Sequence, residues 1–289
     1  MENGQGFDLK LSQLLQNWLE ELQKNIRPTS FVMYQSHVNH YLCPLLGDLS
    51  LTELSPSAGK KLDSDLKKLG LSAKTAKDIL GKFNQALRWG ADQGYDIPLL
   101  QQPFSFQSNK DVRILSTEEE LRMEAYLSSA SETLRNGITL ALRAGLTIGE
   151  LCAVSWEDFD VKKRKIRVHQ ICQRAPNGLV YEEINERVVP LPVELHLRDG
   201  NSEKGFFLRS TRGGAAEPRL CQFWLKSFLN AYHLPLDITF AVFRNTYIKN
   251  LMESGMDFIE ISRYSGCKNL NDLWQRFGRF YQGNLNQTG

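Results

Sequence analysis

Four basic residues recur along one stretch of this 289-residue sequence, and their spacing suits contacts with an anionic partner. The stretch SAKTAKDILGKFNQALRWGADQG opens with Ser and closes with Gly, which are common helix start and stop signals. Lys and Arg neutralise phosphates, so basic side chains along one helix are a possible electrostatic footprint for nucleic acid. The candidate binding residues of this helix are Lys74, Lys77, Lys82 and Arg88.

A second basic cluster, VKKRKIR, begins at residue 161, and a solvated turn before a strand explains it equally well. The total charge is close to balanced, with 35 Lys and Arg against 33 Asp and Glu. Residues 1–110 hold 12 basic and 11 acidic residues and the remainder holds 23 and 22, so each part carries about +1. The electrostatic footprint is therefore modest, although net charge does not exclude a local patch.

Cysteine and histidine do not form a metal-binding pattern. The five cysteines, Cys43, Cys152, Cys172, Cys221 and Cys267, show neither C-x-x-C nor His-cluster spacing. His169 and His233 have no partner spacing and are interpreted as surface or packing residues. We expect free thiols, no metal and no other cofactor. The first residues lack a basic and apolar leader pattern, and no window approaches 18 apolar residues, so a cytoplasmic, membrane-free protein is expected.

The first part of the chain is expected to form a small unit of four helices. LSQLLQNWLEELQKNI carries the apolar stripe of an amphipathic helix, and Pro28 with the following Thr and Ser starts a second helix that Gly47 ends. Residues 95–117 contain two prolines, several glutamines and no helical period. We therefore predict a helical domain over residues 8–100, a linker over 101–112 and a second domain over 113–289.

The second domain is expected to be mostly helical with a small antiparallel β-hairpin. Thr117 with Glu120 is a possible capping box that opens a helical stretch reaching Gly145. KRKIRVHQICQR and GLVYEEINERVVPLP then alternate like strands, and Asn177-Gly178 between them favours a hairpin turn. From CQFWLKSFLNAYH onward the pattern is helical again. The fold class is mostly α with a small β-hairpin (α+β), in two domains.

In their order and spacing, these landmarks resemble the tyrosine recombinase or phage integrase family over nearly the whole chain. The landmarks are LGDLSLTEL and GLSAKTAKDILGKFNQAL in the first domain, and AGLTIGELCAVSWEDFD, ERVVPLP and ITFAVFRNTYIKNLMESGMDFIEISRYSGC in the second. The resemblance implies a two-domain clamp around double-stranded DNA, with a SAM-like core-binding domain before a catalytic domain. It also implies that the helix bearing Lys74 and Lys77 faces the duplex.

The family's chemistry is attack of a tyrosine hydroxyl on a DNA phosphodiester, assisted by cations and a proton donor. In the family pattern GLRxxEL, an arginine holds the scissile phosphate, but the matching residue here is Thr147. The hairpin lysine is missing too, because no lysine occurs between Lys165 and Lys204 and Glu182 lies in the matching region. Glu150 matches the acidic position of the same family pattern.

The remaining family positions lie in the last third of the chain. The HxxR signature reads Ala241-Val242-Phe243-Arg244, so the arginine is present and the histidine is not. The LGH signature reads Ser265-Gly266-Cys267. The family spacing from this signature to the nucleophilic tyrosine leads to Arg276 or Phe277. We favour Phe277, because its ring replaces a tyrosine ring without the hydroxyl. Arg244 alone matches, either as a phosphate contact or as a structural ion-pair partner, for which Glu150 is a candidate.

These departures predict a recombinase fold without recombinase chemistry. The degenerate positions are Thr147, Glu182, Ala241, Arg244, Cys267 and Phe277, of which only Arg244 keeps the family residue. The alternative is that displaced residues rebuild part of the site. Tyr281 lies one helical turn after Phe277, and Arg143 lies one turn before Thr147. A helical turn moves a side chain farther than in-line attack allows, which counts against that alternative.

Two hypotheses on function follow, and an active integrase with relocated residues is a distant third. In the first, the chain binds double-stranded DNA as an accessory or regulatory factor of a mobile element or recombination system, with Arg244 and the basic helix as contacts. In the second, it is a protein-interaction module that pairs with an active recombinase through the C-terminal helix. Across these hypotheses, the expected partners are double-stranded DNA, an active recombinase, or a second copy of the chain.

Overall fold

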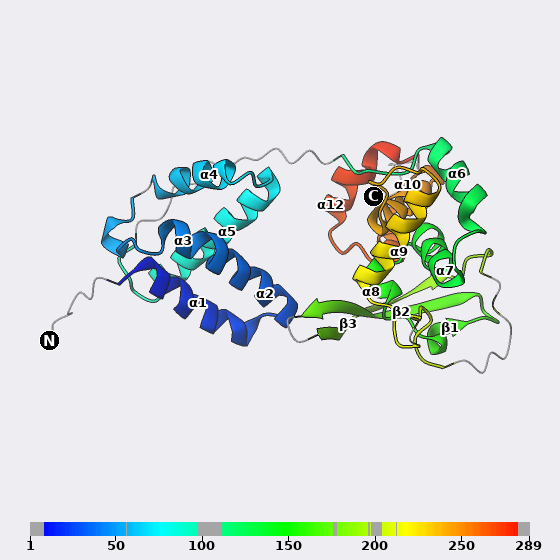
Figure 1. Ribbon diagram of the computed structural model, residues 1–289, viewed down its shortest axis with the longest axis horizontal. Coiled ribbons are helices and arrows are strands. Elements are labelled where there is room, and N and C mark those ends of the chain that lie inside the picture. Colours follow the sequence, from blue (N-terminus) through cyan, green and yellow to red (C-terminus); the bar gives the residue numbers. More distant parts are fainter. Residues whose placement is uncertain are drawn as a thin grey trace. The chain divides into compact units, whose positions relative to one another are not determined.

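The computed structural model describes residues 9–282 except 56, 98–110, 176–177, 196, 198–203 and 212. Most of the predicted linker and part of the predicted hairpin turn lie outside these residues. The chain divides into two compact units, residues 1–109 and 110–289, each with its own core (Figure 1). Among the described residues, no helix is long and apolar enough to cross a membrane.

The described part of unit 1 is helical apart from its turns and one isolated bridge between Lys10 and Ser50. Its amphipathic helices bury one face each, as Leu11, Leu14, Leu15, Trp18 and Leu19 do in the first helix. The elements are α1 (Leu11–Asn25), α2 (Pro28–His37), the π-helical turn η1 (Val38–Leu42), α3 (Cys43–Leu46), the 3-10 turn η2 (Leu51–Glu53), α4 (Ala58–Lys68) and α5 (Ala73–Asp92).

The longest helix of unit 1, α5, begins where the sequence predicts. The Ser72 side chain accepts a hydrogen bond from the Thr75 amide, which caps the first turn. The apolar side of the helix packs into the core through Ile79, Phe83 and Leu87. The opposite side is thereby turned to solvent over the whole length of the helix.

Unit 2 is mostly helical around a larger core. Ser116 and Glu119 form the capping box of its first helix, so the predicted box at Thr117 and Glu120 is wrong by one residue. The helical elements are α6 (Thr117–Leu127), α7 (Glu132–Arg143), α8 (Ile148–Leu151), η3 (Trp156–Asp158), α9 (Pro218–Ala231), α10 (Phe240–Glu253), α11 (Phe258–Ser265), α12 (Leu270–Phe277) and η4 (Gly278–Phe280).

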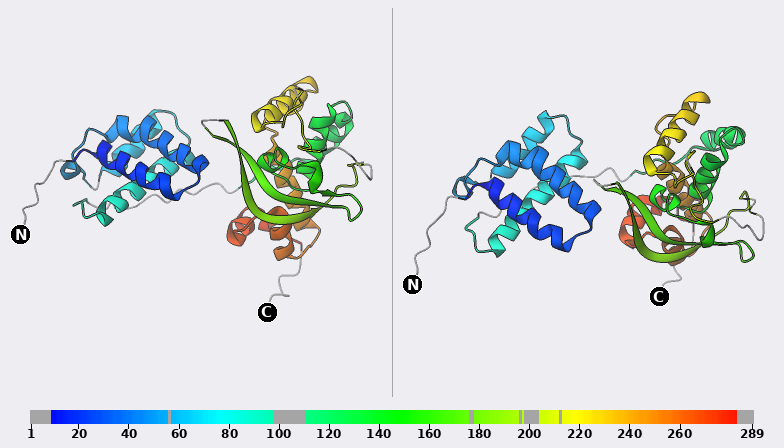
Figure 2. Two further views of the ribbon diagram at one scale, coloured as in Figure 1. Left: turned by 90° about the horizontal axis from the view of Figure 1, so that it is seen from below. Right: turned by 60° about the horizontal axis from the view of Figure 1, so that its bottom comes forward.

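The sheet of unit 2 has three antiparallel strands in the order β1–β2–β3. They are β1 (Phe159–Asp160), β2 (Lys165–Ala175) and β3 (Gly178–Pro190), and an irregularity in register lies between Val168 and Gln170. Figure 2 shows the two long strands curving beside the helices, where α8 and α9 contact β2 and α11 contacts β3. The expected fold class, mostly α with a small antiparallel sheet, is confirmed.

The helices after α9 form a small apolar cluster of their own. It is built from Tyr247, Ile248, Met252, Ile261, Leu273 and Phe277. The larger core lies between α7, α9, α10 and the sheet. The C-terminal helices α11 and α12 therefore pack mainly on the second half of α10, and α11 also contacts β3.

Candidate functional site

Thr147 begins the short helix α8 rather than facing an open cleft. Its hydroxyl oxygen accepts from the Glu150 amide at 3.3 Å, and its own amide donates to Glu150 Oε2 at 2.7 Å. This reciprocal capping box satisfies two amides that a helix start leaves without partners. A threonine here is thus explained by helix capping, a role that arginine lacks.

Glu150 forms a buried bidentate ion pair with Arg187 of β3. Nη1 and Nη2 of Arg187 donate to the two carboxylate oxygens at 2.5 and 2.9 Å, and both residues are less than a tenth exposed. Burial alone raises the pKa of Glu150, but Arg187 and the nearby Arg244 outweigh it, so the pKa lies below 4.5. The pair fixes α8 to the sheet.

Arg187 is a residue that the sequence interpretation missed. It also donates from Nε to the main-chain oxygen of Tyr264 at 3.2 Å, and its guanidinium lies against Gly266 so closely that a Cβ there would approach Nη1 to 3.0 Å. Gly266 has a φ of 67°, so glycine is required on both grounds. The two-residue period of the strand could have revealed that Arg187 is buried, because Arg187 and the buried Val189 share one face of β3.

The guanidinium of Arg244, on α10, donates its hydrogen bonds to main-chain groups of the protein itself. Its two terminal nitrogens donate to the main-chain oxygens of Gly145 and Ser265, and Nη2 also contacts the Cys267 sulfur at 3.8 Å. Nη1 lies 3.9 Å from Glu150 Oε2, and the side chain is only 15% exposed. The structural role expected for Arg244 beside Glu150 has a direct geometric basis, whereas any phosphate would have to compete with these carbonyls.

The other degenerate positions lie on different elements of unit 2. Ala241 is exposed in the first turn of α10, and Glu182 is half-buried on β3 opposite Ile171. Cys267 is half-buried, and its main-chain oxygen accepts from the Ser262 hydroxyl at 2.7 Å. Among the described residues, Cys267 contacts Arg244, and Thr147 is hydrogen-bonded to Glu150.

Phe277, the residue favoured for the nucleophile position, is fully buried in the C-terminal apolar cluster. Its neighbour Arg276 is about a third exposed and contacts Asn245 Oδ1 at 3.4 Å and Asp272 at 3.6 Å. Of the two candidates for the nucleophile position, Arg276 and Phe277, only Arg276 faces solvent. Tyr281 is half-buried in an aromatic group, with ring centroids 5.9 Å from Trp274 and 6.2 Å from Phe258.

Tyr247 is a second residue that the sequence interpretation missed. It lies on α10, one turn after Arg244, and its ring packs on Gly145, where a Cβ would approach the ring to 2.3 Å. Only 7% of Tyr247 is exposed, and burial raises its pKa to about 12. A hydroxyl in that state is a poor nucleophile, because little of it ionises near neutral pH.

The predicted basic helix, α5, presents three of its four candidate residues. Lys74, Lys77 and Arg88 are exposed, whereas Lys82 is 6% exposed and its ammonium lies 4.8 Å from the centre of the Tyr34 ring. Burial lowers the pKa of Lys82. Spacing alone did not separate the exposed residues from the buried one.

A groove of about 270 Å³ follows this helix in unit 1, with Tyr34, Lys77, Gly81 and Gln85 among its lining residues. A Cβ at Gly81 would meet no atom within 4 Å, so the groove is open over the helix backbone. The Tyr34 hydroxyl donates to Gln85 Oε1 at 3.2 Å on one side. Residues 74, 77, 81, 85 and 88 share this side of α5, because they recur at three- and four-residue spacing.

The remaining candidates have structural partners. Arg143 pairs with Glu124 and with Glu194 at 3.2 Å, and His169 lies 3.1 Å from the buried Asp158. In the VKKRKIR cluster, Arg164 donates to the main-chain oxygens of residues 191 and 192. His233 has a φ of 50° after α9. These contacts agree with the solvated-turn and packing interpretations.

Comparison with known proteins identifies the family. The model for the phage integrase family matches residues 109–279, and the model for the phage integrase N-terminal SAM-like domain matches residues 10–66. This chain belongs to the phage integrase family. A tyrosine recombinase XerC-like protein of Caldanaerobacter subterraneus subsp. tengcongensis is 24% identical over 312 residues, which cover 91% of this chain and 78% of the relative.

Other relatives of this integrase-family chain are similarly distant. A shufflon-specific DNA recombinase of Escherichia coli is 24% identical and covers 78% of this chain, which spans about half (54%) of that relative. The Tn1549 transposon integrase, solved in complex with a circular intermediate DNA, has a TM-score of 0.79 at 19% identity, covering 94% of this chain and 95% of that one. A lambda integrase dimer bound to a core site has a TM-score of 0.72 at 17% identity, covering 94% and 78%. The structural likenesses confirm the fold, and the family models confirm the family resemblance.

Proposed function

We propose that this integrase-family chain binds double-stranded DNA without cutting it, as an accessory or regulatory factor of a mobile element or recombination system. The observation that carries the proposal is the arrangement around Arg244. Both terminal nitrogens of its guanidinium donate to main-chain oxygens, and Thr147 caps a helix where the family has a phosphate-binding arginine. The polar groups at the centre of unit 2 therefore bond to other groups of the protein.

The residues at and near the nucleophile position support the same proposal. Phe277 has no hydroxyl and no exposed surface, and Arg276 next to it is a cation. Tyr247 lies near the arginines but is buried with a raised pKa, and Tyr281 packs among aromatic rings. Neither residue at the matched position carries a hydroxyl, and Tyr247 and Tyr281 are buried or packed, which supports loss of the family's covalent route.

The exposed face of α5 supports DNA binding. Lys74, Lys77 and Arg88 lie on one side of a helix of 20 residues, and Lys77 lines the open groove. Phosphates along a duplex repeat at spacings that a helix of this length spans several times. The Tn1549 and lambda integrases, whose fold this chain shares, were solved in complex with DNA.

A trapping assay tests the proposal. The chain is incubated with a pool of mixed-sequence duplexes that carry nicks, so that any cleaved strand end is lost and a covalent intermediate accumulates. We expect gel-shift binding that weakens steeply with salt, and no adduct that survives detergent. An adduct would overturn the proposal, and its loss in Tyr281→Phe or Tyr247→Phe would identify a relocated nucleophile.

A second candidate function, a module that pairs with an active recombinase or with a second copy, is supported by the surface of α11 and α12. Ile259, Leu270 and Trp274 are 54%, 43% and 39% exposed there. Exposed apolar residues gathered on neighbouring helices are typical of protein contacts. Light scattering with and without DNA tests this candidate: a dimer that Ile259→Ser with Leu270→Ser abolishes, together with no DNA binding, would favour it over the first.

A further inference from the structure

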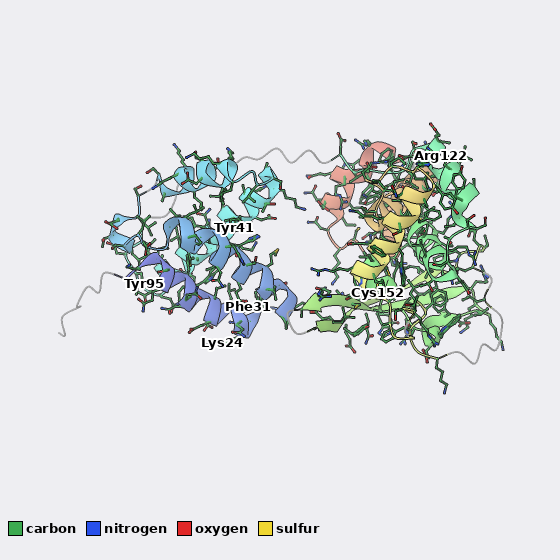
Figure 3. The ribbon with its side chains drawn as sticks, in the orientation of Figure 1. Lys24, Phe31, Tyr41, Tyr95, Arg122 and Cys152 are labelled. Atoms are coloured by element: carbon green, nitrogen blue, oxygen red, sulfur yellow. The ribbon has the colours of Figure 1, made fainter. Side chains whose placement is uncertain are left out.

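Two buried cysteines of unit 2 face each other at the junction of α8 and α9. Cys152 directly follows α8, Cys221 lies in the first turn of α9, and their sulfur atoms are 3.7 Å apart. They are 1% and 2% exposed. Figure 3 labels Cys152 close to the end of α9. A disulfide needs a sulfur separation of about 2.05 Å, so a shift of less than 2 Å between the side chains would suffice.

The surroundings hold this pair in place. Cys172 of β2, itself 1% exposed, is a third thiol in the same core, and α8, α9 and β2 contact one another there. The backbone at Gly149 approaches β2 so closely that a Cβ would lie 3.0 Å from the Cys172 carbonyl oxygen. Cys43 and Cys267, by contrast, are half-buried and are not in this core cluster.

The two sulfurs of the pair are not equivalent. The two sulfurs share one hydrogen bond, in which either thiol can donate, so one sulfur of the pair can ionise while the other keeps its proton. The position of Cys221 in the first turn of a 14-residue helix distinguishes the two, because amides at a helix start stabilise a thiolate. The helix start therefore favours the thiolate on Cys221 rather than on Cys152.

We propose that Cys152 and Cys221 form a reversible disulfide when the protein meets a peroxide, and that this bond locks α8 to α9. The Cys221 thiolate attacks one peroxide oxygen, the O–O bond breaks, and water leaves once the departing oxygen is protonated. The sulfenic acid on Cys221 is then attacked by the Cys152 sulfur, the S–S bond forms, and a second water leaves. Both sulfurs are oxidised by one electron each, and the peroxide is reduced to two waters.

The lock acts on the helix that Thr147 caps and that Glu150 anchors to the sheet. Closing the long chain segment between α8 and α9 also restricts the unfolded state. The oxidised form should therefore melt several degrees higher than the reduced form. This inference is independent of DNA binding and of catalysis.

Peptide mapping of the native protein tests the proposal. Fully reduced chain is treated with hydrogen peroxide, alkylated in denaturant without reductant, digested and analysed by mass spectrometry. We expect a linked peptide pair containing Cys152 and Cys221, a loss of two hydrogens, and reversal by dithiothreitol. The link should persist in Cys172→Ala and disappear in Cys152→Ala, and thermal unfolding followed by circular dichroism verifies that each variant is folded.

Three results would overturn the proposal. One is that both thiols stay open to alkylation after peroxide has oxidised Cys43 or Cys267. Another is a link that involves Cys172, or one that forms only after denaturant has unfolded the chain. The third is a lower melting temperature of the linked form, which would mean that the bond distorts the native fold. Because the mapping uses the unaltered chain, a variant that fails to fold does not affect the result.

Discussion

The exposed side of α5 in unit 1 and the centre of unit 2 both contain several cations, but the two regions use them differently. On α5, Lys74, Lys77 and Arg88 extend into solvent beside an open groove. In unit 2, the buried Arg187 and the half-buried Arg244 donate to a carboxylate and to main-chain oxygens. The number of cations therefore does not measure the capacity to bind phosphate; the number of donors that remain accessible does.

The charge balance of the two units makes this difference sharper. Unit 1 holds 11 basic and 11 acidic residues and unit 2 holds 24 and 22, so their net charges of 0 and +2 are both small and do not explain the difference. A buried arginine with its hydrogen bonds satisfied contributes to stability, and its removal leaves its partner charged and desolvated. An exposed lysine contributes little to stability and much to salt-dependent association. The same residue class should thus give opposite phenotypes in the two units.

The largest expected effect is on the stability of unit 2. Arg187→Ala leaves the Glu150 carboxylate buried without its bidentate partner, and we expect a loss of about 3–5 kcal/mol in the free energy of unfolding. Urea unfolding followed by circular dichroism measures it. The double variant Glu150→Gln with Arg187→Met removes both charges and should recover most of the loss. A loss below about 1 kcal/mol would show that the pair is not a stabilising centre.

The next largest effect is on DNA affinity through α5. Removing Lys74, Lys77 and Arg88 together should weaken binding to a mixed-sequence duplex about a hundredfold near 0.1 M salt, since each lost phosphate contact lowers the salt slope by about 0.9. Gel shifts at several salt concentrations measure both quantities. The charge-matched control replaces Lys60, Lys61 and Lys68, which are exposed on α4. Equal weakening in the control would mean that α5 contributes only general charge.

Local sequence patterns predicted the secondary structure, but they did not predict which cations are exposed. The helices and the hairpin follow from local apolar periods, so α1, α5 and the β2–β3 pair could be expected from the chain alone. Whether a cation is exposed depends on how elements pack. Lys82 fits the basic helix by spacing but is buried over Tyr34, and Arg187 looks like an ordinary strand residue until β3 is placed against α8. Long-range packing, which no local pattern encodes, decides both.

A smaller effect is expected from pH. The pKa of Glu150 is below its ordinary value of 4.5, since Arg187 and Arg244 outweigh burial. Its contribution to stability is thus complete above 4.5 and declines as the pH falls through the folded value. The stability difference between wild type and Glu150→Gln should therefore narrow on acidification, by at most about 1.4 kcal/mol per pH unit for one proton. Urea unfolding at pH 7, 5, 4 and 3 measures it, and a constant difference would contradict the assignment.

The smallest expected effect is the one that decides between the two interpretations of Arg244. If its donors are committed to Gly145 and Ser265, Arg244→Met should change DNA affinity less than about threefold and leave the salt slope unaltered, although one cation is lost. The orphaned carbonyls should lower the melting temperature at the same time, because each loses its hydrogen bond. Binding is therefore measured well below that temperature, where circular dichroism shows the variant folded.

The opposite result has an equally definite meaning. A salt slope that falls by about 0.9 in Arg244→Met would show that a phosphate displaces the carbonyls and that unit 2 retains one contact of the family's reaction centre. Thr147→Arg then serves as the matched gain variant, because a second guanidinium beside such a phosphate should raise the slope by a similar amount. If Arg244 is purely structural, Thr147→Arg has no phosphate to meet and only loses the α8 capping box, which should cost about 1 kcal/mol of stability. Opposite signs in the two variants would identify a working phosphate pocket, and two unchanged slopes would identify a centre that serves stability alone.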